Sequence, residues 1–572
     1  MSDDEYDDNT LRERIEEHPR PAVIWVAVLL AILSLEVGRI AAGVIRAGEA
    51  TRFTLSGASR VPAWVGANVE GTLGPTAGVV GTVLTVVVLL GVIALFVKWL
   101  LVPVSLVSKL GIDRGTTLDD VLERVLIAGL LGVGALLIVF TPAGSGLELA
   151  ISWVTNRLQW VANLPTLTSP ETISNAGHRS PDGGWEGTFL GLSPGQAWAI
   201  RVLVVYGYAF GLLAWLWKGY TIFREHYREA DWTPRDDSIN RFRTHYWGIF
   251  GLVVVFSFVV MAAWAPALAP VPIDHNHYNP YDHEFEYLDG ETVTAITHGT
   301  ANLQTQSAGG EQNVGPLSYD QYDRWAPLGT TNEGKDMFTF LAYGARTSLV
   351  IGLIAIGVGT MIALSLSLIT AYYKGVADLV TVLASDTIMT IPGFLLLLLV
   401  SVIFQQADHP LARVYDGGLL IALILAVVYW PGLWRSIRGP SLQVAEQEWV
   451  DAAKSYGQSP FTIMRKHMAP YVAAYIMIYA SLLLGAAIIA TAALSFLGLG
   501  INPPTPEWGR IVDDGRSYVS TTSWHISTIP GLLIVLVVTG FNALGDGIRD
   551  AMDPESGVGG DEATAAATGG GG

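Results

Sequence analysis

Seven predominantly apolar windows, each at least 18 residues long, contain no Asp, Glu, Lys or Arg, and this feature constrains the fold more than any other. They cover residues 77–97, 246–269, 347–373, 387–407, 417–434, 471–498 and 526–545. The hydrocarbon core of a bilayer is ~30 Å thick, and a helix needs ~20 apolar residues to cross it. Because the backbone polar groups must be hydrogen-bonded within such a segment, the stretches predict transmembrane α-helices.

Three further windows are apolar but short or charged, at residues 22–44, 125–141 and 198–217. In the first, Glu36 and Arg39 lie three residues apart and can pair on one helix face near a membrane end. In the third, Arg201 lies near one end, where its side chain can snorkel to the interface. We therefore expect an all-α polytopic membrane protein with about ten transmembrane helices.

The composition excludes several other classes of protein. Only 15% of the 572 residues are charged, against ~25% in an average soluble protein. The formal net charge of −18 argues against nucleic acid as a partner, because phosphate backbones are bound by basic surfaces. There is no Cys, which excludes disulfides, thiolate catalysis and Cys-ligated zinc.

The distribution of Lys and Arg predicts the topology in the cell membrane. With both termini cytoplasmic, 20 of the 33 Lys and Arg residues lie inside, as the positive-inside rule favours. Residues 218–245 are then cytoplasmic and residues 270–346 form an extracellular loop, called the outer loop below. In the outer segment 142–197, apolar residues at helical spacing predict a helix lying on the membrane. The Gly- and Ala-rich residues 555–572 predict a disordered tail.

Two segments match the letters of catalytic motifs without their context. Residues 329–336 read GTTNEGKD, but Asp336 stands where a phosphate-binding loop needs Ser or Thr, and no strand precedes the segment. Residues 191–195 read GLSPG, where Ser193 and Pro194 are typical of a helix cap and first helical position rather than a nucleophile elbow. We predict no catalytic set, so the chain is not expected to be an enzyme.

Other polar residues also favour structural roles. His275, His277, His283, Glu284 and Glu286 could ligate a metal, but they surround Pro280 without fixed periodicity, which favours a solvated loop and no metal or cofactor. Asp378, Asp386 and Asp546 lie near the ends of predicted spans. There, structural or interface-facing roles are favoured over a proton relay.

The segment between Trp434 and Tyr471 is predicted to be cytoplasmic and to contain a helix at residues 444–456. Gly457 follows it and suits a helix C-terminus. Ala452 and Ala453 leave one face smooth, and Trp449 and Tyr456 are large side chains seven residues apart. These residues fit docking into a partner groove and equally a helix packed on its own membrane domain.

The sequence DAAKSYG, followed nine residues later by HMAP, resembles the cytoplasmic signature E-A-A-x3-G-x9-I-x-L-P of ABC-importer permeases. More narrowly, the chain is similar to the dipeptide/oligopeptide/nickel permease family. Three segments carry that resemblance: LGTTNEGKDMFTFLAYGARTSL, LSFLGLGINPPTPEWGRIVDDGR and PGLLIVLVVTGFNALGDGIRDAMDP. The chain departs from the family at Asp451 (usually Glu), Thr331 (Asp), Lys335 (Arg) and Ala469 (Leu).

The resemblance implies a type I importer permease core at residues 246–554, with six transmembrane helices. Residues 1–245 are left as an extension with about four spans and no assigned role. The family's partners would be a sister permease, two ABC ATPase subunits and an extracellular substrate-binding protein, in addition to membrane lipid. The function implied is the import of dipeptides or oligopeptides. The alternatives are nickel or another small solute, or a self-contained secondary transporter, which would favour mid-span charges that the core spans lack.

The same resemblance assigns roles to individual residues. A cytoplasmic helix at about 446–457 would couple ATP hydrolysis to alternating access. Its coupling residues would be Glu448, Trp449, Asp451, Ala452, Ala453, Tyr456 and Gly457, with Pro470 after them. Arg435 and Arg438 would frame the cytoplasmic loop. Pathway or structural roles are expected for Pro392, which can kink its span, and for Ser495, Phe496 and Asp546.

Overall fold

The computed structural model describes residues 11–68, 143–230, 232–406 and 409–552. Among these residues, six helices are long and apolar enough to cross a membrane, or eight if each of two bent helix pairs is one span. The all-α prediction is therefore confirmed, and with the two apolar windows at 77–97 and 125–141 the count reaches about ten. Those two windows and the predicted tail at 555–572 lie outside the described residues.

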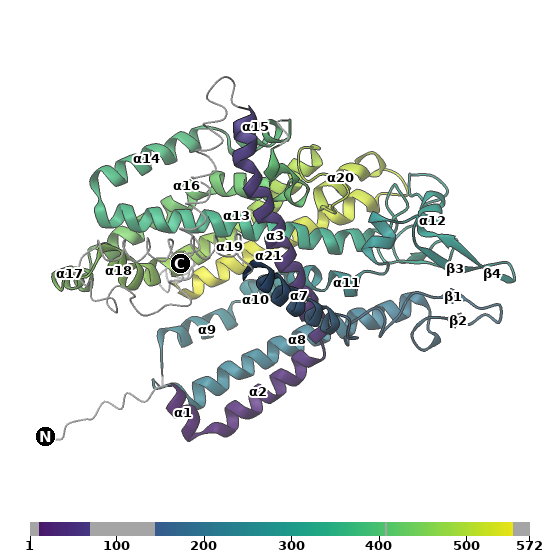
Figure 1. Cartoon of the computed structure of the whole chain (residues 1–572), viewed down its shortest axis with the longest axis horizontal. Helices are drawn as coiled ribbons and strands as arrows, with labels where there is room; N and C mark the ends of the chain where they lie inside the picture. Colours follow the sequence, from purple (N-terminus) through teal and green to yellow (C-terminus); the bar gives the residue numbers. More distant parts are fainter. Residues whose placement is uncertain (1–10, 69–142, 231, 407–408, 553–572) are drawn as a thin grey trace, which may run out of the picture.

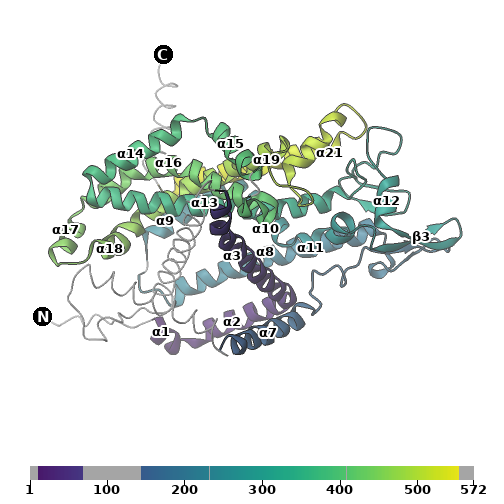
Figure 2. The same cartoon turned by 45° about the horizontal axis from the view of Figure 1, so that its top comes forward.

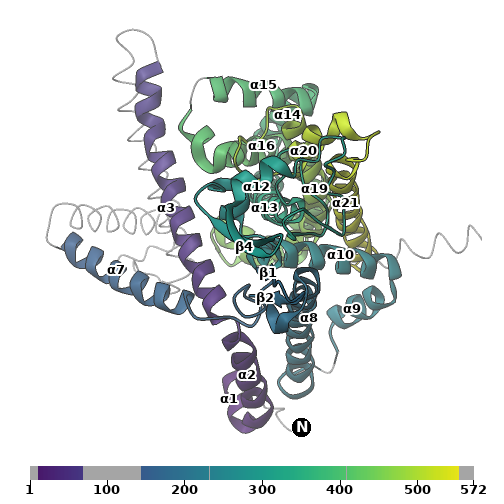
Figure 3. The ribbon, with the colours of Figure 1, turned by 90° about the vertical axis from the view of Figure 1, so that its right-hand side faces the viewer.

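The first 245 residues contribute helices that flank the remainder of the molecule. They are α1 (Leu11–Glu17), α2 (Pro19–Ser34), α3 (Val37–Asn68), α7 (Ala143–Ala162), α8 (Pro194–His226) and α9 (Pro234–Thr244). A short strand pair, β1 (His178–Arg179) and β2 (Trp185–Glu186), lies between α7 and α8. Figure 3 shows α3 and α7 on the side of the molecule opposite α21, and Figure 2 shows α2 beside α8.

The core is built from helices of different lengths, and the longest, α13 (Met337–Tyr373), runs roughly along the long axis of the molecule (Figure 1). The others are α10 (Tyr246–Ala263), α11 (Ala265–Leu268), α14 (Gly375–Thr390), α15 (Gly393–Gln406), α16 (Gly418–Ala445), α19 (Ala469–Phe496) and α21 (His525–Met552). Short elements join α16 to α19: α17 (Glu448–Ser455), α18 (Pro460–Ile463) and a π-helical turn (Met464–Met468).

The outer loop carries the strands and short helices at the opposite end of the long axis from α17 (Figure 1). They are β3 (Glu284–Asp289), β4 (Thr292–Thr297), α12 (His298–Gln304), β5 (Ser318–Tyr319) and β6 (Trp325–Ala326), preceded by a π-helical turn (Asp274–Tyr278). β3 and β4 form an antiparallel hairpin in which Glu284 lies opposite Thr297. α20 (Trp508–Gly515) packs beside this region, between α19 and α21.

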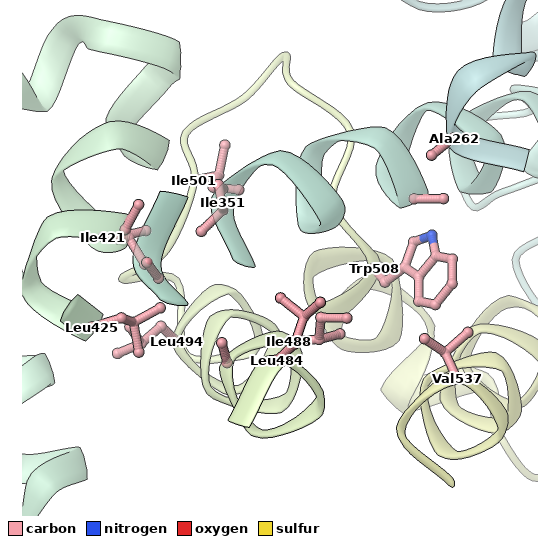
Figure 4. Packing of buried hydrophobic residues seen from close by; sticks show 14 of the residues in the cluster. Ala262, Ile351, Ile421, Leu425, Leu484, Ile488, Leu494, Ile501, Trp508 and Val537 are labelled. Atoms are coloured by element: carbon pink, nitrogen blue, oxygen red, sulfur yellow. The ribbon is translucent and has the colours of Figure 1, made fainter. Parts of the chain in front are cut away.

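Apolar side chains from the core helices interlock in one large cluster. Figure 4 shows Leu484 and Ile488 between Ile421 and Leu425 on one side and Trp508 on the other. The Trp508 side chain is fully buried, and its indole N–H donates to the Leu341 carbonyl at 2.8 Å. This buried bond satisfies the only polar atom of the ring and fixes α20 against α13.

Glycines allow α10 and α21 to cross closely. A Cβ on Gly251 would lie 2.3 Å from the Leu544 amide nitrogen, and one on Gly248 would lie 2.9 Å from Gly547 Cα. Such contacts are impossible for any larger residue. The pairing therefore uses the small-residue interface typical of membrane helices.

Two sequence-based details of the first 245 residues need correction. The window 22–44 is not one helix, because α2 ends at Ser34 and α3 begins at Val37. The predicted pair is present at this break: Glu36 binds Arg39 at 2.7 Å and also accepts from the Thr168 amide at 2.9 Å. Arg201 does not snorkel; it is fully buried and donates to the carbonyls of Ile173 and Ala269 at 3.0 and 2.8 Å. It thus joins α8 to the core.

The predicted span at 387–407 is interrupted. α14 ends at Thr390 and α15 begins at Gly393, with an angle of 83° between the two helices. Pro392 lies in the break, where its missing N–H and ring oppose helix continuation. The expectation of a kink at this position is confirmed.

Candidate functional site

The candidate site is α17 and the ends of the helices that hold it. α16 continues to Ala445, about three turns beyond the predicted span end at Trp434. Arg435 and Arg438 therefore belong to α16 and precede the segment that they were predicted to frame. The uncharged window ends at Trp434 because Arg435 is charged, and a charged side chain is costly inside the bilayer. The helix itself continues beyond this window to Ala445. The predicted helix at 444–456 is likewise divided, with a break at Glu446 and Gln447.

Both arginines of α16 bind aspartates of α14. Arg438 donates to the two carboxylate oxygens of Asp378, from Nε at 2.8 Å and from Nη2 at 2.5 Å. Arg435 pairs with Asp386 and donates from Nε to the Ser385 hydroxyl at 3.2 Å. These partners could not be predicted, because they lie about 50 to 60 residues away along the chain. The pairs fix α14 to the part of α16 that precedes α17.

One face of α17 is anchored in the membrane domain. Val450 is fully buried and Ala453 is 5% exposed. Both belong to an apolar cluster with Trp434 of α16, Ile463 of α18 and Met468 of the π-helical turn. We expected Ala452 and Ala453 to face a partner together, and for Ala453 this is wrong: consecutive helical residues are ~100° apart, and Ala453 shares the inward face of Val450.

The opposite face of α17 is open. Glu448, Asp451, Ala452 and Ser455 are exposed, and Tyr456 at the C-terminal end is 87% exposed. Within the part of the chain that the structure describes, Asp451 forms its ion pair with Lys454 of the same helix, at 3.0 Å.

Trp449 is partly covered. Its ring lies 5.3 Å from that of Tyr471 at the start of α19. Trp449 and Tyr456 are therefore not two equivalent free knobs, because one is held by the membrane domain and the other projects from it.

The end of α17 has the hydrogen bonding of a Schellman motif. The Gln458 amide donates to the Ala453 carbonyl at 3.2 Å, and the Gly457 amide donates to the Lys454 carbonyl at 2.9 Å. Gly457 has φ +73°, a left-handed conformation that glycine adopts without a Cβ penalty. The prediction that Gly457 ends the helix is confirmed. Pro470 is the second residue of α19, where a helix does not need its N–H.

The remaining candidate residues lie apart from α17. Ser495 is 3% exposed, and its hydroxyl accepts from the Ile501 amide at 3.4 Å at the C-terminal end of α19. Phe496 is the last residue of α19 and is half-buried. Asp546 is exposed on α21, which continues past it to Met552. These residues and Pro392 do not gather in one place with the α17 residues.

The motif-like segments have structural roles. Ser193 caps α8 with Pro194 as its first residue, as expected, and its hydroxyl accepts from the Gln196 amide at 3.4 Å. Asp336 caps α13, accepting from the Thr339 amide at 2.7 Å. In the His-rich stretch, His283 binds Asp274 at 2.8 Å. Among the described residues, no three His, Cys, Asp or Glu side chains are grouped so that they could hold a metal.

Comparisons with known proteins agree with this arrangement. A model of the binding-protein-dependent transport system inner membrane component matches residues 355–557, and one of the N-terminal transmembrane domain of oligopeptide transport permease C matches residues 233–288. The glutathione transport system permease protein GsiD of Pectobacterium atrosepticum is 31% identical over 323 residues, which are 56% of this chain and 92% of that protein. The dipeptide transport system permease protein DppC of Alkalihalophilus pseudofirmus is also 31% identical, over 56% of this chain and 90% of that protein. The chain belongs to the inner-membrane permease family of binding-protein-dependent ABC importers.

Proposed function

We propose that this permease imports short peptides together with a sister permease, two ABC ATPases and an extracellular binding protein. The related permeases are named for glutathione and dipeptide transport, which supports a peptide substrate. ATP hydrolysis is assigned to the separate ATPase subunits. The observation that carries the mechanism is the two-faced α17, anchored on one side and open on the other.

The anchored face gives α17 a mechanical connection to the spans. Val450 and Ala453 pack in one cluster with residues of α13, α16 and α19. Because packed interiors transmit displacement rather than absorb it, a push on the open face moves the ends of these helices together. The pairs of Arg435 and Arg438 extend the connection to α14.

The open face supplies the contact for an ATPase. Glu448, Asp451, Ala452, Ser455 and Tyr456 are exposed there, with small and charged side chains beside one aromatic ring. A helix of this kind fits a groove on a partner. Closure of two ATPases on ATP would displace α17 and switch the pathway between its outward and inward states.

The topology follows from the same proposal. Both termini and α17 are cytoplasmic, and the outer loop is extracellular. The chain lacks Cys, so Thr300→Cys and Ser455→Cys each introduce one thiol at an exposed position. An impermeant maleimide should label the first on intact cells and the second only after permeabilisation. The reverse pattern would overturn the topology.

Transport is tested with the full complex in proteoliposomes. Radiolabelled dipeptide should accumulate only when the binding protein and ATP are both present on their proper sides. Accumulation driven by an ion gradient without ATP would show a secondary transporter instead. The domain proposal, in which residues 1–245 are an addition to a core at 246–554, is tested by a chain starting at Arg241. That chain should still assemble with the sister permease.

A further inference from the structure

A small polar cavity opens where the outer loop meets α20. It has a volume of about 180 Å³ and lies between residues 331–335, the π-helical turn at Asp274–Tyr278 and the first turns of α20. We call it the outer pocket. It is not part of α17 or of its anchoring cluster, which lie at the opposite end of the molecule (Figure 1).

Charged groups of both signs line the outer pocket. Lys335 and Arg510 are its cations, and Glu333 and Asp514 are its carboxylates. Lys335 is already paired with Glu333 at 2.6 Å. Asp514 is exposed, one helical turn after Arg510.

Arg510 is left with unused hydrogen-bonding capacity. Its Nη1 is buried and has no hydrogen-bond partner among the described residues, and its guanidinium lies 5.5 Å from the centre of the Phe340 ring. An unsatisfied buried donor on a charged group is costly. The guanidinium is the side chain best matched to a carboxylate, which it can bind with two parallel bonds. The pocket therefore offers a place for a ligand carboxylate.

His277 supplies the complementary group. It is 8% exposed, and its Nδ1 has no partner among the described residues. Burial, with the nearby charges of Lys335 and Arg510, lowers the pKa of His277 to about 4, so the ring is neutral at pH 7. A neutral imidazole whose other nitrogen bonds the Pro504 carbonyl has a free acceptor at Nδ1. That acceptor and the Asp514 carboxylate suit an ammonium.

We propose that the outer pocket binds a small zwitterion of the peptide class, with its carboxylate on Arg510 and its ammonium toward His277 and Asp514. Equal numbers of cations and carboxylates favour a ligand that carries both charges over a simple anion. The choice of a peptide rests on the proposed function. The pocket would hold substrate at the outer face of the permease after its release from the binding protein.

The test uses the permeases and ATPases in lipid nanodiscs, without the binding protein, and titrates glycylglycine by calorimetry. We expect saturable binding of one molecule. Blocking both termini of the peptide should abolish binding, and acetate or ethylamine alone should bind at least tenfold more weakly.

Arg510→Gln should weaken glycylglycine binding at least tenfold without lowering thermal stability. Arg516→Gln is the matched control, because Arg516 directly follows α20 but its side chain is 67% exposed and paired with Asp513. It should bind like the unchanged chain. Equal effects of the two substitutions, or no saturable binding, would overturn the proposal.

Two further outcomes separate this site from other possibilities. Acetate binding as tight as that of glycylglycine would show an anion site and overturn the peptide assignment. If Arg510→Gln weakens only docking of the binding protein, the pocket receives a protein side chain and the proposal is also wrong. ATP-driven dipeptide uptake is measured in parallel. Uptake without glycylglycine binding would overturn the outer-pocket proposal and leave the proposed function standing. Absence of uptake would overturn the proposed function.

Discussion

Replacing Ala452 or Ala453 by Trp will separate partner docking from folding, because the first residue is exposed on α17 and the second is buried. Ala452 is exposed, so a Trp there need not displace a buried side chain of the described residues, and its helix-propensity cost is below ~0.7 kcal/mol. Ala453 is 5% exposed and packed in the cluster with Trp434 and Met468. Overpacking such a position costs typically ~1–3 kcal/mol.

The expected results therefore differ in kind. Ala452→Trp should leave the thermal midpoint of the purified permease pair nearly unchanged and lower ATPase copurification at least tenfold, which is ~1.4 kcal/mol of binding free energy. Peptide-stimulated ATP hydrolysis in proteoliposomes should fall in parallel. Ala453→Trp should lower the thermal midpoint first and lose ATPase binding as a consequence.

Normal ATPase recovery and normal stimulated hydrolysis for Ala452→Trp would refute the docking assignment of the open face. A thermal midpoint unchanged by Ala453→Trp would refute the anchoring of the inward face. ATPase binding therefore tests the open face of α17, and the thermal midpoint tests its inward face independently.

Three further predictions concern other contacts. Arg438→Gln should lower the free energy of unfolding by about 1 kcal/mol. Adding Asp378→Asn should lower it little further, because both changes remove the same partly exposed ion pair. Additive losses in thermal midpoint would show that the pair contributes nothing. Gly457→Val should reduce ATPase binding, since φ +73° penalises a β-branched residue by ~1 kcal/mol or more. Gly457→Asn should reduce ATPase binding less, because Asn tolerates this conformation better. Equal binding by both variants would contradict the role of Gly457 at the helix end. Burial raises the pKa of Glu507, the cap of α20, to about 7, so between pH 4.5 and 7 the folded state binds a proton that the unfolded state has released, and stability conferred by that group falls as pH rises. Thermal midpoints of Glu507→Gln should depend less on pH across this window, and an identical pH profile would be the contrary result.

The spans could be predicted from sequence because the bilayer imposes a length and a composition on each of them. Helix boundaries beyond the bilayer could not, since nothing in the composition marks where α16 ends after Arg435. The break at Leu35 and Glu36 was also missed, because Leu, Val and Ala continue on both sides of it. There the local pattern is helical, and the break is accompanied by a tertiary contact between Glu36 and Thr168.

The site was predictable to a similar extent. Gly457 could be assigned from the end of a helical pattern, and the structure places it there with positive φ. The inward direction of Ala453 could not be assigned from the sequence. It depends on where α17 starts, and α17 starts after a break at Glu446 and Gln447 that the residue pattern does not show. The partners of Arg438 and the unpaired Nη1 of Arg510 depend on segments brought together only by the fold.

The central claim is that α17 is the contact through which ATPases drive this permease. The direct measurement is cross-linking from a single thiol on the open face, and Ser455→Cys provides it with minimal change in an otherwise Cys-free chain. Thr300→Cys, exposed on the outer loop, is the matched control. The account predicts that a short thiol-reactive cross-linker joins Ser455→Cys, and not Thr300→Cys, to an ATPase subunit, with a yield that changes when ATP is bound. Absence of that product from an assembled, transport-active complex would contradict it.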